Sequence, residues 1–139
     1  MKLHEAPSPN ARRVHIAMAE KGVEIERVAV DIRGGENISA EYLAKNPGGR
    51  VPMLELDDGT FIGESVSITR YLDAISEGPS LFGDSPLAQA QIDMWQRRAE
   101  FNFLLEVAGA FRNITGFFKD RETCVEAWGV VCADKAPKA

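Results

Sequence analysis

One stretch of the chain largely determines the expected fold, and it reads Asn46-Pro47-Gly48-Gly49-Arg50-Val51-Pro52-Met53-Leu54-Glu55-Leu56-Asp57-Asp58-Gly59-Thr60-Phe61-Ile62-Gly63-Glu64-Ser65. Asp58-Gly59 between two apolar runs is a strong β-hairpin signal. Pro52 precedes the first run, where a missing backbone N–H does least harm. Glu64 and Ser65 place an acid and a hydroxyl beside the unpaired N–H groups of a helix start. The stretch therefore predicts a backbone edge next to a polar helix end, which suits a small peptide with an amine and a carboxylate.

The residues before this stretch predict an alternation of strands and helices. Ser8 can cap a helix that Pro9 begins and Gly22 ends, with Arg13 and Lys21 on its solvent side. Alternating apolar residues indicate a second strand. The expected elements are strands over 1–4 and 25–32, helices over 9–21, 40–45 and 65–76, and the hairpin. Their order, βαβαββα, predicts a parallel first strand pair and an antiparallel last pair, hence an α/β domain.

Beyond this domain the chain changes character. We expect a first domain over 1–78, a turn-rich linker over 79–86 and an all-α unit over 87–139, with helices over 87–114 and 121–133. Two helices cannot bury both of their faces, so the helical unit reads as incomplete. Apolar surface around Trp95 and Trp128 should then be exposed or covered by another chain.

Composition and charge exclude several classes of function. The 139 residues are 45% hydrophobic and 27% charged, with a net charge of −5, as in an ordinary soluble globular protein. The negative charge argues against a nucleic-acid or anionic-membrane surface, and no apolar run approaches the roughly 20 residues of a membrane span. Cys124 and Cys132 form no disulfide framework, which with the polar N-terminus favours the cytoplasm. His4 and His15 lack ligand-spaced partners, so we expect no metal.

Several separate motifs, in the right order, resemble the glutathione S-transferase family, and most strongly a bacterial and fungal branch. The motifs are Leu3-His4-Glu5-Ala6-Pro7-Ser8-Pro9-Asn10-Ala11-Arg12-Arg13-Val14, Val51-Pro52, Glu64-Ser65, Phe82-Gly83, Trp95-Gln96-Arg97-Arg98-Ala99-Glu100 and Glu126-Ala127-Trp128-Gly129. The resemblance implies a thioredoxin-like first domain that holds glutathione. It also implies a helical second domain that supplies most of the electrophile pocket, and a homodimer.

The resemblance also assigns roles to the residues of the quoted stretch. It implies that the backbone of Val51 pairs with the cysteinyl part of glutathione and that the Val51–Pro52 bond is cis. Glu64 and Ser65 then receive the γ-glutamyl amine and carboxylate, and Arg50 is a partner for the glycyl carboxylate. Helix capping is the alternative role for Glu64 and Ser65, an ordinary exposed arginine is the alternative for Arg50, and the start of an edge strand is the alternative for Pro52.

Thiol activation is expected from the start of the first helix. Serine-type members of the family place the activating serine four residues before an arginine, as Ser8 stands to Arg12. The branch often has alanine at this point, so Ser8 as catalytic residue is a hypothesis, with Asn10 as second candidate and simple capping by Ser8 as the alternative.

The function implied is glutathione transfer to a hydrophobic electrophile in cytoplasmic detoxification. A non-catalytic glutathione-binding module and a dimeric scaffold without a complete electrophile pocket are the alternatives. A thiol oxidoreductase is disfavoured because no cysteine stands near the first helix.

Overall fold

The computed structural model describes residues 1–138, which fall into two compact units, Met1–Phe82 and the residues from Gly83 onward. The elements of the first unit are β1 (Lys2–Glu5), α1 (Pro9–Lys21), β2 (Glu26–Ala29), the 3₁₀ turn η1 (Glu36–Ile38), α2 (Ala40–Lys45), β3 (Met53–Glu55), β4 (Phe61–Ile62) and α3 (Ser65–Ile75). The predicted βαβαββα order is confirmed.

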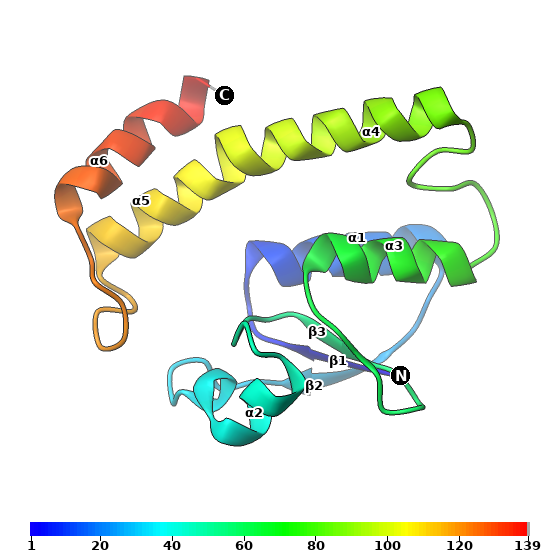
Figure 1. Ribbon diagram of the computed structural model, residues 1–139, viewed down its shortest axis with the longest axis horizontal. Helices are drawn as coiled ribbons and strands as arrows, with labels where there is room; N and C mark the ends of the chain where they lie inside the picture. Colours follow the sequence, from blue (N-terminus) through cyan, green and yellow to red (C-terminus); the bar gives the residue numbers. More distant parts are fainter. Residues whose placement is uncertain (139) are drawn as a thin grey trace. The chain divides into compact units, whose positions relative to one another are not determined.

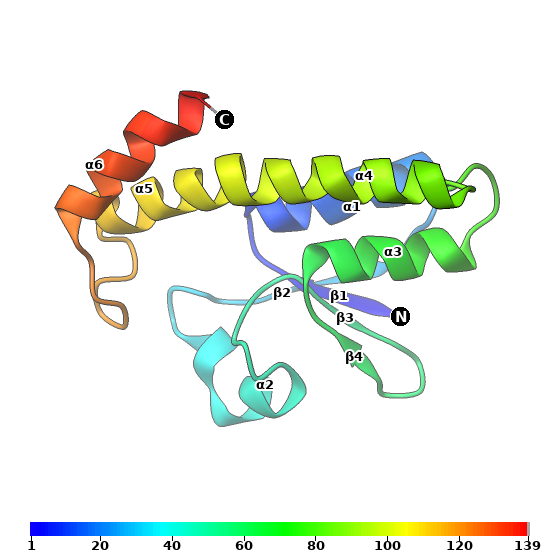
Figure 2. The same ribbon diagram turned by 45° about the horizontal axis from the view of Figure 1, so that its top comes forward.

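The four strands form one sheet in the order β2-β1-β3-β4. β1 pairs with β2 in parallel, and β3 pairs with β1 and β4 in antiparallel fashion, as the hairpin and crossover signals predict. α1 and α3 cover one face of the sheet and α2 lies on the other (Figures 1 and 2). This is the thioredoxin-like arrangement expected for the first domain.

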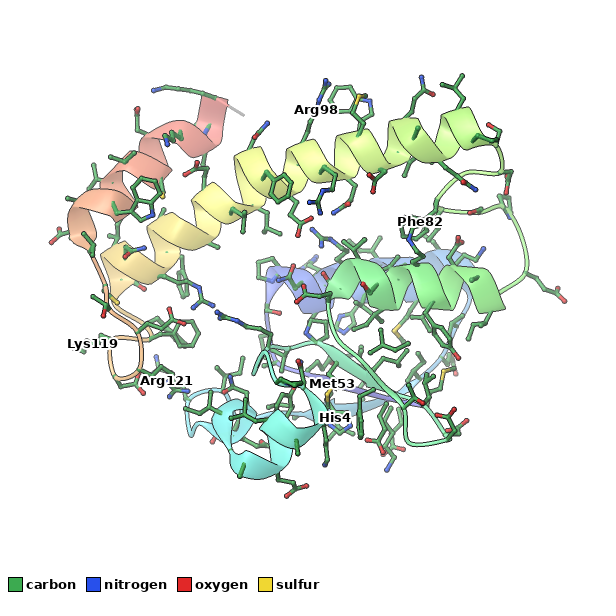
Figure 3. All side chains as sticks on the ribbon, in the orientation of Figure 1. His4, Met53, Phe82, Arg98, Lys119 and Arg121 are labelled. Atoms are coloured by element: carbon green, nitrogen blue, oxygen red, sulfur yellow. The ribbon has the colours of Figure 1, made fainter. Side chains whose placement is uncertain are left out.

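Each face of the sheet has its own apolar core. On the side of α1 and α3, the buried cluster consists of Leu3, Val14, Met18, Leu54, Ile68 and Leu72. On the side of α2, Met53 packs with Val30 and Tyr42. Figure 3 labels Met53 and its cross-strand neighbour His4 on this second face. Because successive strand residues alternate between faces, the register of β1 and β3 determines both cores.

Strand β2 is shorter than the predicted span over 25–32. The strand ends at Ala29 because Asp31 starts a turn: its Oδ1 accepts the Gly34 N–H at 2.8 Å, and its own N–H donates to Glu36 Oε2 at 2.7 Å. Local side-chain bonds of this kind compete with strand pairing.

The second unit contains three α-helices within the described residues, with a π-helical segment between the first two. Its elements are α4 (Pro86–Arg98), the π segment η2 (Ala99–Leu104), α5 (Leu105–Thr115), α6 (Glu126–Lys135) and the 3₁₀ turn η3 (Ala136–Lys138). The prediction of one continuous α-helix over 87–114 is therefore wrong over 99–104, where the backbone is π-helical. The predicted start of the last helix at 121 is also wrong, because the Val125 N–H bonds to Asn113 Oδ1 at 2.8 Å and α6 begins after it.

Large apolar side chains remain at the surface of the second unit. Trp95 is 63% exposed and Trp128 is 50% exposed, in line with the apolar surface expected there. No helix among residues 1–138 is both long and apolar enough to cross a bilayer.

A buried ion pair ties the end of the first unit to its helices. Lys21 Nζ lies 3.0 Å from Asp73 Oδ1, and both side chains are less than a tenth exposed. The prediction that Lys21 lies on the solvent side of its helix is therefore wrong. Asp73 also accepts the Leu81 N–H at 2.9 Å and the Ser80 hydroxyl at 2.8 Å. Lys21 donates in addition to the Pro79 carbonyl. Residues 79–81 are thus anchored to α1 and α3.

We predict that Asp73→Asn lowers the free energy of unfolding by about 3–5 kcal/mol, because it leaves the buried Lys21 ammonium without its counter-charge. Urea unfolding of the variant measures this, with Asp93→Asn on the exposed face of α4 as the control. A loss no larger than in the control contradicts the prediction.

The carboxylate of Asp73 should also make the free energy of unfolding depend on pH in the acid range. Burial pushes the pKa of Asp73 up, but the Leu81 N–H, Lys21 and Ser80 outweigh it, so the pKa lies below its ordinary value. The stability it contributes is present above the unfolded-state pKa of about 3.9 and is lost as the pH falls through the lower folded-state pKa. The difference in stability between wild type and Asp73→Asn should therefore begin to shrink as the pH falls below about 4, and it should disappear only below the folded-state pKa of Asp73.

α5 and α6 approach closely at two glycines, Gly109 of α5 and Gly129 of α6. A Cβ at Gly129 would lie 2.8 Å from Ile114 Cγ1 and 3.1 Å from the Ile114 backbone nitrogen. We predict that Gly129→Ala destabilises the second unit by about 1–3 kcal/mol through overpacking. Thermal unfolding followed by circular dichroism tests this against Val130→Ala, an exposed position on the same helix. Equal midpoints would contradict it.

Candidate functional site

The N-termini of α1 and α3 lie at the same edge of the first unit (Figures 1 and 2). Ser65, the first residue of α3, is 5% exposed. Its Oγ accepts a hydrogen bond from Arg13 Nη1 at 2.8 Å and donates one to Asn10 Oδ1 at 3.4 Å. The structure therefore brings two predicted site residues, Asn10 and Ser65, into direct contact although 55 positions separate them.

Glu64 holds an unusual backbone conformation at the start of α3. Its φ is 61° and its ψ is 118°, and it is the one non-glycine residue with positive φ among residues 1–138. Such a conformation costs on the order of 1–3 kcal/mol and is typical of functional sites. The Glu64 side chain is exposed and makes no capping bond to α3, so the capping alternative does not account for it.

Ser8 caps α1, as expected. Its Oγ accepts the Ala11 N–H at 3.1 Å, and Pro9 occupies the first helical position. This bond uses a lone pair of the oxygen and leaves the hydroxyl hydrogen, for which the described residues provide no acceptor. Capping and donation to an anion are thus compatible in Ser8.

The loop before β3 supplies the predicted backbone edge. The Val51–Pro52 bond is cis, which confirms that expectation, and Pro52 is buried. Arg50 is exposed and Val51 is half-buried. Within residues 1–138 the N–H and C=O of Val51 take part in no hydrogen bond. A buried proline next to a residue whose N–H and C=O have no partner leaves a short edge that an extended peptide can join.

The sequence did not predict three residues that contact the candidate site residues. Arg13 was expected on the solvent side, yet it is half-buried and bonds to Ser65. Tyr42 and Asn46 both donate to the Arg50 carbonyl, the first through its hydroxyl at 2.9 Å and the second through Nδ2 at 2.8 Å. The presence of Arg13 in the quoted N-terminal motif was the available signal. Nothing in the spacing of Tyr42 and Asn46 points to their common acceptor.

The two histidines have carboxylate partners that sequence spacing did not reveal. His4 Nε2 lies 2.6 Å from Glu55 Oε2, and this contact holds the pKa of Glu55 below its usual range. His15 bonds to Glu5, whose other oxygen accepts from Arg27 Nε at 2.5 Å. Among the described residues no three or more His, Cys, Asp or Glu side chains gather as metal ligands.

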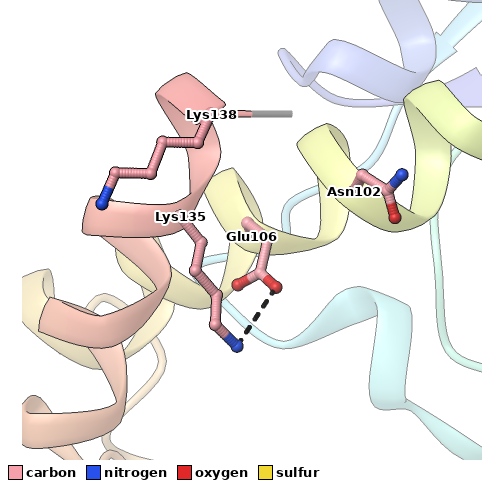
Figure 4. Close-up of a pocket in the computed structure, with 4 residues that line it drawn as sticks. All are labelled: Asn102, Glu106, Lys135 and Lys138. Carbon is pink, nitrogen blue, oxygen red and sulfur yellow. Dashed lines mark ion pairs between the residues drawn. The ribbon is translucent and has the colours of Figure 1, made fainter.

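The second unit carries a hollow of about 330 Å³ lined by Asn102, Glu106, Lys135 and Lys138 (Figure 4). Lys135 Nζ lies 3.9 Å from Glu106 Oε1 across it. Its lining contains none of the residues that the sequence analysis assigns to glutathione.

Comparison with known proteins agrees with this geometry. Residues 7–75 match the family model described as glutathione S-transferase, N-terminal domain. Glutathione S-transferase 2 of Saccharomyces cerevisiae is 40% identical to the chain over 98% of the chain's length, and the chain spans 60% of the length of that relative.

Solved structures agree with the sequence matches. The crystal structure of a glutathione S-transferase domain-containing protein from Marinobacter aquaeolei superposes with a TM-score of 0.94 at 40% identity, over 99% of this chain and 70% of that one. A glutathione transferase homologue from Sulfitobacter, solved with bound glutathione, superposes with a TM-score of 0.77 at 26% identity, over 99% of this chain and 63% of that one. Together with the fold and the site, these matches mean that the chain belongs to the glutathione S-transferase family.

Proposed function

We propose that this protein is a glutathione transferase that joins the thiol of glutathione to a hydrophobic electrophile. The observation that carries the proposal is the buried Ser65 hydroxyl at the start of α3, which is bonded to Arg13 and Asn10 of α1 and adjoins Glu64. A hydroxyl and a carboxylate at a helix N-terminus form a receptor for a group that carries both an anion and an ammonium.

In this proposal the γ-glutamyl carboxylate binds the N–H groups of the first turn of α3 and the Ser65 hydroxyl, whose hydrogen turns from Asn10 Oδ1 to the carboxylate. The γ-glutamyl ammonium binds Glu64, whose carboxylate is exposed and not used for capping. The cysteinyl part pairs with the open Val51 backbone next to Pro52, and Arg50 binds the glycyl carboxylate. The bound glutathione of the Sulfitobacter homologue and the name of the yeast relative support glutathione as the ligand.

The chemistry is the activation of a thiol. A free thiol has a pKa of roughly 8.5, so it is mostly protonated at neutral pH. Lowering that value by two units requires about 2.7 kcal/mol of preferential stabilisation of the thiolate. The hydroxyl hydrogen of Ser8 and the N-terminal N–H groups of α1 supply donors for this, and the amide of Asn10 on the same helix is the second candidate donor. The thiol proton passes to solvent and the thiolate attacks the electrophilic carbon held beside it; with a nitroaromatic halide the new carbon–sulfur bond replaces the carbon–halogen bond and halide leaves.

The remaining parts of the proposal concern the protein as a whole. Residues 1–78 form the glutathione-binding domain, 79–86 the linker, and the helical residues from 87 onward contribute to the electrophile pocket. The protein acts as a homodimer in the cytoplasm, in detoxification. The exposed aromatic side chains of α4 and α6 support a role for the helices in apolar contacts.

Calorimetry with glutathione, followed by a conjugation assay with a nitroaromatic halide, tests the proposal. Binding and turnover together are expected. Binding without turnover would replace the proposal by a glutathione-binding module, and no binding at all would favour a scaffold without this ligand.

Ser8→Ala should raise the pKa of the bound glutathione thiol and lower kcat/KM, because a donor to the thiolate is lost. The thiolate absorbance of the complex, titrated against pH, measures the shift. Ser85→Ala is a matched control, because Ser85 caps α4 in the same Ser-Pro arrangement and accepts the Ala88 N–H at 3.2 Å. Both variants should lose about 1 kcal/mol of stability through the lost cap. An unchanged thiol pKa in Ser8→Ala would eliminate Ser8 as the activating residue.

Ser65→Ala should weaken glutathione binding by about tenfold or more, because a hydrogen bond to a charged group is worth roughly 1.5–3 kcal/mol. The bound thiol pKa should change little, since Ser65 contacts the other end of the ligand. Ser67→Ala, an exposed serine on the same helix, is the control and should bind as wild type does. Equal affinities of the two variants would exclude Ser65 as the carboxylate receptor.

A further inference from the structure

The carbonyl of Arg50 accepts two side-chain hydrogen bonds. Tyr42 Oη donates to it at 2.9 Å and Asn46 Nδ2 at 2.8 Å. A carbonyl oxygen has two lone pairs, so these two donors fill its capacity. Tyr42 belongs to α2 and Asn46 ends it, and the Asn46 N–H bonds to the Tyr42 carbonyl at 2.8 Å. Both donors therefore come from one short, locally ordered segment.

The same peptide unit carries the Val51 N–H. The Arg50–Val51 bond is trans, and in a trans peptide the C=O and the N–H point in opposite directions within one plane. Two donors on the oxygen therefore determine the direction of the N–H on the other side. They also polarise the amide and make its hydrogen a stronger donor. Among residues 1–138 no acceptor takes this hydrogen.

The surroundings hold this arrangement in place. Tyr42 is 5% exposed and packs with Val30 and Met53 in the core on the α2 side. Burial raises the pKa of Tyr42, only partly opposed by Asn46, so its hydroxyl remains a donor at neutral pH.

The preceding carbonyl is fixed as well. Gly49 has a φ of 57°, and its carbonyl accepts from Asn37 Nδ2 at 2.6 Å. Asn46 Oδ1 accepts the Gly48 N–H at 3.2 Å, which orients its amide group. The loop is thus braced on both sides of the Arg50 carbonyl.

We propose that Tyr42 and Asn46 are positioning residues that aim and polarise the Val51 N–H for the cysteinyl carbonyl of glutathione. They act through the Arg50 carbonyl and do not touch the ligand. This inference rests on the proposed function, because it specifies how one contact of that site is prepared.

The test compares two ligands that differ in the carbonyl that Val51 is inferred to bind. γ-Glutamylcysteine amide carries it, and γ-glutamylcysteamine lacks it. Calorimetry on the wild-type chain should show that the amide binds about two- to tenfold more tightly, the range of one neutral hydrogen bond. Tyr42→Phe removes one donor and should reduce this ratio. The double variant Tyr42→Phe/Asn46→Asp removes both donors, keeps the acceptor for Gly48, and should bring the ratio close to one.

Two matched controls separate this role from general damage. Tyr71→Phe removes the hydroxyl of the other tyrosine of the first unit, and Asn102→Asp makes the amide-to-acid change in the second unit. Both should keep the wild-type ratio. If Tyr42→Phe and the double variant weaken both ligands equally, the two residues only stabilise the loop and the inference is overturned. If the wild-type chain does not bind glutathione at all, the proposed function itself fails and the inference with it.

A spectroscopic reading covers the case in which the double variant does not fold. The Val51 amide proton should move downfield when the wild type binds γ-glutamylcysteine amide and stay in place with γ-glutamylcysteamine. In Tyr42→Phe the movement should be smaller. An equal movement in wild type and variant would overturn the inference.

Discussion

The packing of α1 against α3 with both N-termini at one edge of the sheet is the constraint on which the site depends. Each helix start has unpaired N–H groups and a partial positive charge, and two of them together favour a ligand with negative charge. The Arg13–Ser65–Asn10 bonds join the two first turns and keep them together. The guanidinium of Arg13 adds its positive charge to that of the two helix starts. This edge therefore attracts an anion through its long-range electrostatic field as well as through direct contacts.

The rest of the first unit positions a further polar group of the proposed site, the backbone N–H and C=O of Val51. The register of β1 and β3 places Leu3 and Leu54 in the core on the α1 side and Met53 in the core on the α2 side, next to the loop that ends at Pro52. Glutathione has two carboxylates, an ammonium and a peptide backbone, so a receptor needs separated polar points and not one deep pocket. In the proposed site the start of α3 and the backbone of Val51 offer some of these points, and the charged side chains of Glu64 and Arg50 offer the others.

Local signals were sufficient to predict most of the first unit. Ser8-Pro9, Gly22 and Asp58-Gly59 act within a few residues, and the elements they delimit appear where expected. The contacts between Arg13 and Ser65 and between His15 and Glu5 were not predictable, because they depend on which faces of α1 meet α3 and β1. In the second unit the π segment over 99–104 interrupts a run whose apolar spacing predicts one α-helix. A π turn contains only one residue more than an α turn, and the spacing of apolar residues does not reveal that difference.

The sheet order has a consequence for self-association. β2 and β4 are the edge strands, and an open edge invites another strand to pair with it. β4 has only two residues, and β2 carries the charged pair Glu26 and Arg27, so both edges discourage such addition. Within residues 1–138 the N–H and C=O of Val51, by contrast, take part in no hydrogen bond, and Val51 lies in neither edge strand. If Val51 pairs with a peptide as proposed, the unit binds one short peptide through its backbone and presents no long edge strand with which further chains could pair.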